Sequence, residues 1–116
     1  MMAKAYVEEL SELMKQVTLG RYKDVHLEVK HFFAGAAVYA NSKICITLTP
    51  TGLAVKLPTE HRNELLQIQG AEPLRYFSSG RVKKEYVVLP LRMVRDSKAL
   101  RRWLTRSVEY ALSSSE

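Results

Sequence analysis

The stretch from Lys30 to Leu57 constrains the fold of this chain more than any other part of the sequence. It holds three short runs of β-forming residues, at 36–40, 43–49 and 53–57. Asn41-Ser42 separates the first two runs, and Asn tolerates a positive φ better than most residues. Pro50-Thr51-Gly52 separates the last two, where Pro pre-sets φ and Gly supplies a left-handed position. The stretch therefore predicts strands joined by tight hairpin turns.

Side-chain alternation assigns the faces of these strands. We expect one face of the second run to carry Ile44, Ile46 and Leu48, and the other to carry Lys43, Cys45, Thr47 and Thr49. Leu53, Val55 and Leu57 form the next inward row. Cys45 lies between two isoleucines, so a packed, inert thiol is expected rather than a nucleophile, and its outward parity leaves a subunit or helix interface open.

A further strand precedes this stretch, because Val25, Leu27 and Val29 alternate with polar residues. The alternation fails at 31–33, which predicts a bulge or strand end there, with Gly35 taking the unusual backbone angles. A second hairpin is expected from 74–78 and 82–89 across Ser79-Gly80.

Three helices are predicted from apolar residues spaced three and four apart. The first spans about 3–16 and the second about 60–69, capped by Thr59 and ended by Gly70. Asp96 or Ser97 caps the last helix. Its inner stripe is Leu100, Trp103, Leu104, Ser107, Val108 and Ala111, with Trp103 as the core anchor.

Antiparallel hairpins with helices at both ends and one between predict an α+β class. We expect a two-layer fold, in which three helices pack on a curved antiparallel sheet. The length predicts a single domain over residues 1–116, with its core at about 4–112 and a frayed tail at 113–116.

The charge of the chain is concentrated in its second half. Residues 1–72 hold eight Lys/Arg and eight Asp/Glu, so the formal net charge of +6 belongs to residues 73–116. A basic half indicates an anionic partner, nucleic acid first. The candidate contacts are Lys98, Arg101, Arg102 and Arg106 on the last helix, and Arg81, Lys83 and Lys84 in the second hairpin. The alternative is a solvated face in a basic protein.

Nothing in the sequence assembles a reaction centre. Most glutamates are expected on the surfaces of helices, so no pair of carboxylates is available for acid–base catalysis. The three histidines have neither a cysteine pair nor a His-x-x-x-His spacing beside them, so no zinc site is expected. We therefore expect no enzyme activity, metal or cofactor. Cys45 is the only cysteine, the N-terminus lacks a signal-peptide core, and no run approaches the ~18 apolar residues of a membrane span, so a cytoplasmic protein is expected.

Several motifs resemble one bacterial family. They are His31 to Ser42 (HFFAGAAVYANS), Leu53 to Lys56, Gly70 to Tyr76 (GAEPLRY), Leu89-Pro90 and Trp103. Together they resemble the N-terminal domain of the TfoX/Sxy proteins, which are linked to competence for DNA uptake. The likeness covers about residues 4–112. It departs where Ala34 and Ala37 replace family glycines and where the Asn41-Ser42 turn lacks Gly.

The resemblance implies a non-enzymatic regulatory or interaction module with a fold similar to that of secretion chaperones, which commonly dimerise. A homodimer and a protein partner of regulatory type are therefore expected, with no membrane and no small-molecule substrate. The Ala-rich strand at 36–40 would be an aggregation-prone edge if left uncovered, which also favours a dimer. The alternative function is direct, sequence-indifferent binding of nucleic acid through the basic half.

Overall fold

A computed structural model describes residues 2–16, 25–75 and 81–113. The elements, in chain order, are α1 (Met2–Gln16), β1 (Leu27–Phe32), β2 (Gly35–Ala40), β3 (Lys43–Thr49), β4 (Gly52–Lys56), α2 (Thr59–Leu66), β5 (Glu72–Leu74), β6 (Lys83–Val88), α3 (Leu91–Val94) and α4 (Ser97–Ser113). The strands form one six-stranded antiparallel sheet in the order β1-β2-β3-β4-β6-β5. The predicted α+β class is confirmed, and the difference from the three expected helices is the short helix α3.

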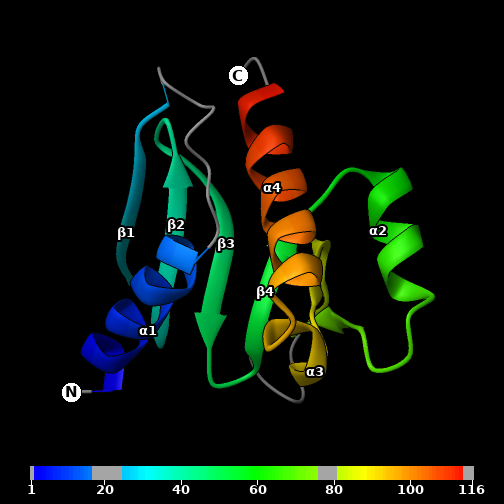
Figure 1. Cartoon of the computed structure of the whole chain (residues 1–116), viewed down its shortest axis with the longest axis horizontal. Helices are drawn as coiled ribbons and strands as arrows, with labels where there is room; N and C mark the ends of the chain where they lie inside the picture. Colours follow the sequence, from blue (N-terminus) through cyan, green and yellow to red (C-terminus); the bar gives the residue numbers. More distant parts are fainter. Residues whose placement is uncertain (1, 17–24, 76–80, 114–116) are drawn as a thin grey trace.

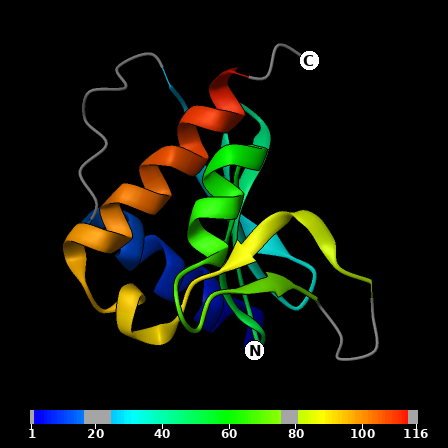
Figure 2. The same cartoon turned by 90° about the vertical axis from the view of Figure 1, so that its right-hand side faces the viewer.

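Helices α1 and α4 cover the same face of the sheet (Figures 1 and 2). The core lies between these helices and the strands. Trp103 is 2% exposed and is part of the same buried cluster as Leu10 of α1 and Ile46 of β3. Helix α2 packs against β6. Trp103 therefore anchors α4 as predicted.

Both predicted turns of the 30–57 stretch are confirmed. Asn41 and Ser42 have φ values of 49° and 71°, the positive pair that a type I′ hairpin turn requires. The Asn41 side chain fastens this turn to the start of β1, because its Oδ1 accepts the His26 N–H at 2.8 Å. Gly52 has a φ of +117° and pairs with Thr49 across the next turn.

The turn between β1 and β2 differs from its prediction. Phe33, and not Gly35, takes the positive φ, at 52°. Gly35 is required for a different reason: a Cβ there would lie 2.0 Å from the Leu48 carbonyl oxygen. The lack of a side chain at Gly35 lets β2 and β3 approach each other closely.

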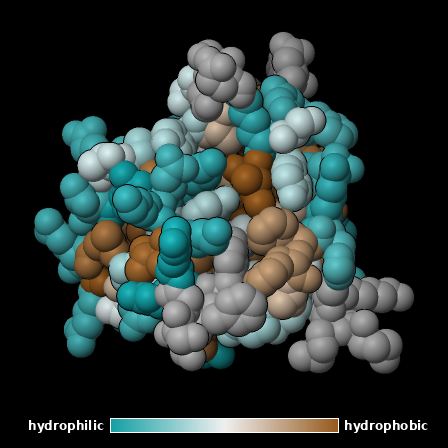
Figure 3. All heavy atoms as spheres, turned by 180° about the vertical axis from the view of Figure 1, so that it is seen from behind, coloured by the Kyte–Doolittle hydropathy of each residue, from teal (hydrophilic) through white to brown (hydrophobic). Residues whose placement is uncertain are grey.

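A β-bulge at Cys45 changes the predicted faces of Ile44 and Cys45, while Ile46 and Leu48 share the core face as predicted. Val38 pairs with Ile46 while Tyr39 pairs with Ile44, so Cys45 is an extra residue without a partner across the ladder. The bulge reverses the alternation at this point. Cys45 is consequently buried in the core cluster beside Ile46, while Ile44 falls on the opposite face with Tyr39. Figure 3 shows that opposite face, where hydrophilic side chains surround apolar patches.

The strand order corrects the reason given for a dimer. Residues 36–40 form β2, which lies between β1 and β3 and is not an edge. It is also covered by α1. The edge strands of the described sheet are β1 and β5.

The remaining boundaries agree in part with the sequence. The N-cap of α2 is Pro58, so the prediction of a Thr59 cap is wrong, and α2 ends earlier than expected, at Leu66. Asp96 caps α4 as predicted, its Oδ1 accepting the Lys98 N–H at 3.1 Å. The predicted Ser79-Gly80 turn lies outside the described residues, as do residues 114–116 of the expected tail.

Candidate functional site

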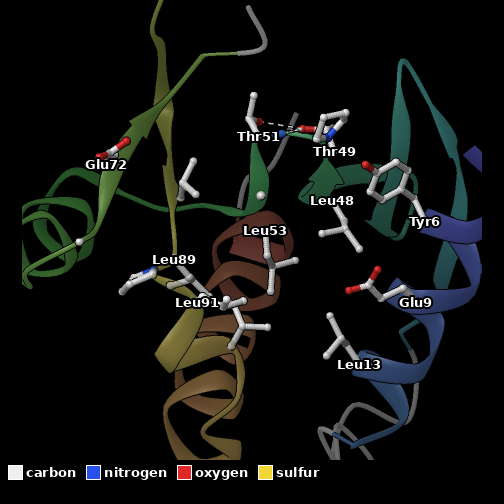
Figure 4. A pocket seen from close by; sticks show the side chains of 16 residues that line it. Tyr6, Glu9, Leu13, Leu48, Thr49, Thr51, Leu53, Glu72, Leu89 and Leu91 are labelled. Atoms are coloured by element: carbon white, nitrogen blue, oxygen red, sulfur yellow. Dashed lines mark hydrogen bonds between the residues drawn. The ribbon is translucent and has the colours of Figure 1, made fainter. Parts of the chain in front are cut away.

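A groove of about 500 Å³ opens at one end of the sheet between α1 and α3 (Figure 4). Its floor is apolar and is built from the Leu48, Leu53 and Leu89 side chains, all 7% exposed or less. Leu91 of α3 stands at its side with 62% exposure. An exposed leucine above a leucine floor is typical of a surface that receives another apolar group.

Polar groups of the groove come mainly from α1 and from the β3–β4 turn. Figure 4 shows the Glu9 carboxylate pointing from α1 into the groove, with Tyr6 beside it. The hydroxyls of Thr49 and Thr51 lie 2.8 Å apart and share a hydrogen bond across the turn. Glu72 lines the far side. The groove therefore combines an apolar floor with acidic groups at two of its sides.

Helix α3 is the wall that the sequence reasoning missed. Four residues, Leu91 to Val94, are too few to show a helical period. The available signal was Pro90, since proline is favoured at helix starts. Arg92 holds α3 in place, because its Nη2 donates to the Gln69 carbonyl oxygen at 2.6 Å. Glu9, an exposed residue of α1, borders the groove on the opposite side from α3.

The basic residues predicted on the last helix share one face of α4. Lys98, Arg101 and Arg102 are exposed and line a shallow hollow of about 350 Å³. The 3.6-residue period explains why they share this face while Leu100 and Trp103 face the core. The structure thus brings these three cations together.

Arg106 lies on the same hollow but already has two partners. Its Nη1 is 3.2 Å from Glu64 Oε2 of α2, and its Cζ lies 4.7 Å from the centre of the Trp103 ring. The ion pair ties α4 to α2, while the cation–π contact lies within α4 and holds the Arg106 side chain against Trp103. Arg106 is therefore engaged in holding the two helices together.

Arg81, Lys83 and Lys84 lie apart from the α4 face. All three are exposed, at or just before the start of β6. Figure 2 shows β6 running out on the other side of α2 from α4. The predicted basic residues consequently form two separate clusters.

The thiol of Cys45 is buried and has a raised pKa. Burial raises its pKa from 9.0 to about 12, against the lowering effect of the Lys56 charge. Its Sγ lies 3.5 Å from the Val38 carbonyl oxygen. The predicted packing of this thiol is confirmed, and its raised pKa agrees with the prediction that it is inert, because the thiolate is the nucleophilic form.

Two negative findings apply to the described residues. Within residues 2–16, 25–75 and 81–113, no three His, Cys, Asp or Glu side chains gather in a way that could hold a metal ion. In the same part of the chain, every helix is too short or too polar to cross a bilayer.

A known protein family matches most of the chain. No curated protein and no solved structure matches the chain. The family model of the TfoX N-terminal domain matches residues 21–111, which include the whole sheet and nearly all of α4. The chain therefore belongs to the TfoX N-terminal domain family.

Proposed function

We propose that this domain is a non-enzymatic interaction module and that its partner is a protein whose apolar, positively charged segment enters the groove between α1 and α3. The observation that carries the proposal is Leu91, which is 62% exposed beside a leucine floor. Burying an exposed leucine against another apolar group is favourable in free energy. An apolar side chain of a binding partner commonly makes such a contact.

The charge of the groove selects the chemistry of the segment. Glu9 and Glu72 are the charged residues among those that line it, and both are exposed. A Lys or Arg next to the apolar anchor would meet these carboxylates, which favours a basic over an acidic segment. A regulatory role for the partner follows from the family resemblance and forms part of this proposal.

A peptide selection tests this function. A random peptide library displayed on phage is selected on the immobilised domain, and the enriched peptide is titrated by fluorescence anisotropy. We expect apolar peptides that carry Lys or Arg. Leu91→Glu should weaken their binding at least about tenfold, because it places a charge at the apolar contact.

Leu66→Glu is the matched control. Leu66 of α2 is also an exposed leucine, at 37%, but does not line the groove. The Leu66→Glu variant carries the same added charge away from the groove. It should therefore bind the peptide as tightly as the parent does. Equal binding of the peptide to the Leu91→Glu variant and the parent would contradict the groove as the site.

A second candidate function, direct binding of nucleic acid, is favoured by the exposed Lys98, Arg101 and Arg102 on one face of α4. Closely set cations bind the phosphate backbone by releasing counterions, and this attraction is indifferent to base sequence. Arg106 is engaged with Glu64, so the main contribution is assigned to the other three.

A salt titration on duplex DNA tests this second function. Arg101→Ala/Arg102→Ala should flatten the slope of log affinity against log salt by about two units relative to the parent. Lys83→Ala/Lys84→Ala lowers the net charge equally and should keep the parent slope. A reversed result would move the contact to β6, and no binding by the parent at low salt would leave the α4 face as a solvated surface.

A further inference from the structure

Strand β1 forms one outer edge of the sheet, and no strand among the described residues pairs with that side of it. The other edge strand, β5, has three residues with Pro73 at its centre. Short length and proline both protect an edge from further pairing. β1 has six residues, no proline and an unbroken register with β2. β1 is therefore the edge suited to accept another strand.

The backbone groups that face this edge follow from the pairing with β2. The Asn41 N–H donates to the His26 carbonyl oxygen at 2.8 Å, so His26 is a hydrogen-bonded position of the ladder. Such positions recur at every second residue of an antiparallel pair. Leu27, Val29 and His31 therefore direct their N–H and C=O groups outward, away from β2.

The side chains next to Val29 are opposite in charge. Glu28 and Lys30 are on the exposed face of β1, with side-chain exposures of 46% and 53%, and Lys30 Nζ lies 3.7 Å from Glu28 Oε1. Val29 is half-buried and packs against the core on the other face. The order of charges along Glu28-Val29-Lys30 is consequently self-complementary when a second copy runs in the opposite direction.

We propose that β1 is a homodimer interface, in which a second copy of this chain extends the sheet antiparallel with the two-fold axis at Val29. This register places Val29 opposite itself and Leu27 opposite His31 of the partner subunit. Every outward N–H and C=O of these residues then meets a complementary group, giving about six backbone hydrogen bonds. In this register, Glu28 lies directly opposite Lys30 of the partner subunit, and Lys30 lies opposite Glu28 of the partner subunit. These two pairs occupy the closely spaced positions on either side of the axis.

Charge excludes the neighbouring registers. If the two-fold axis moves from Val29 to Glu28, Glu28 lies opposite Glu28 of the partner subunit. If the axis moves to Lys30, Lys30 lies opposite Lys30 of the partner subunit. Like charges directly opposite each other destabilise a strand pair, whereas opposite charges stabilise it. A lysine on an edge strand normally prevents pairing with another chain. At the Val29 register, Glu28 neutralises that lysine.

Charge reversal followed by sedimentation equilibrium of the full chain tests the interface. The parent should dimerise at micromolar concentration. Glu28→Lys and Lys30→Glu should each raise the dimer Kd about tenfold, because attractive pairs become repulsive. The double variant, with both charges exchanged, should dimerise like the parent, and an equimolar mixture of the single variants should recover the dimer.

These variants separate loss of the interface from misfolding, since a misfolded single variant could not be rescued by mixing. Leu91→Glu lies outside β1 and should dimerise like the parent, so failure of the groove proposal does not affect this test. A monomeric parent would overturn the inference. So would single variants that dimerise as tightly as the parent, or a double variant that dimerises as weakly as the single ones.

Discussion

Replacing Ser107 with Ala should destabilise this domain more than any other removal of a single hydroxyl group on α4. The pairing of β3 with β4 runs from the turn at Thr49–Gly52 to Ile46–Val55, and the next residues, Cys45 and Lys56, do not pair with each other. The Ser107 hydroxyl occupies this gap. It accepts the Lys56 N–H at 3.1 Å, and its proton lies within reach of the Cys45 and Lys56 carbonyl oxygens, at 2.7 and 2.8 Å.

The magnitude follows from the groups left without a partner. Ser107 is fully buried, so water does not replace its hydroxyl. Each backbone group stranded in this way costs about 1–3 kcal/mol, and the Lys56 N–H and one carbonyl are affected. The higher helix propensity of alanine offsets about 0.5 kcal/mol of this destabilisation. We expect the free energy of unfolding to fall by about 1.5–5.5 kcal/mol.

Urea unfolding followed by far-UV circular dichroism measures this change. Ser113→Ala is the matched control, because Ser113 is exposed on the same helix and its Oγ donates to the Tyr110 carbonyl oxygen at 2.9 Å. It should alter stability by less than about 0.5 kcal/mol. If the two variants were equally stable, the groups in the gap would be satisfied without Ser107 and the reasoning would be wrong.

Three further predictions concern the core. Trp103→Ala should cost about 3–5 kcal/mol in urea unfolding, and an unchanged midpoint would show that α4 is docked differently. Gly35→Ala should cost about 1–3 kcal/mol or more, because its Cβ would lie 2.0 Å from the Leu48 carbonyl oxygen; a parent-like melting temperature would disprove that close approach. The Cys45 pKa is raised on folding, so its contribution to stability is complete below pH 9.0 and is lost as the pH rises towards about 12. The free energy of unfolding should fall by up to about 1.4 kcal/mol per pH unit across that range, and Cys45→Ala, measured in the same buffers, should lack this part of the slope.

The sequence by itself determined the features that depend on neighbours along the chain. The Asn41-Ser42 turn follows from the tolerance of its first residue for a positive φ, and the chain's own twist favours the turn type it adopts. The faces of α4 follow from the helical period, which is why Lys98, Arg101 and Arg102 could be placed together before the fold was known. Local chemistry is sufficient for each of these.

Only the tertiary structure decided the features that depend on segments far apart in the sequence. Gly35 is set by the approach of the Leu48 backbone, and the burial of Cys45 by a bulge against β2. Arg106 could be assigned to a partner only once α2 was placed beside α4. The groove has the same origin, since its walls are α1 and α3, from opposite ends of the chain. The position of β6 between β4 and β5 brings those ends together, and no local pattern contains that information.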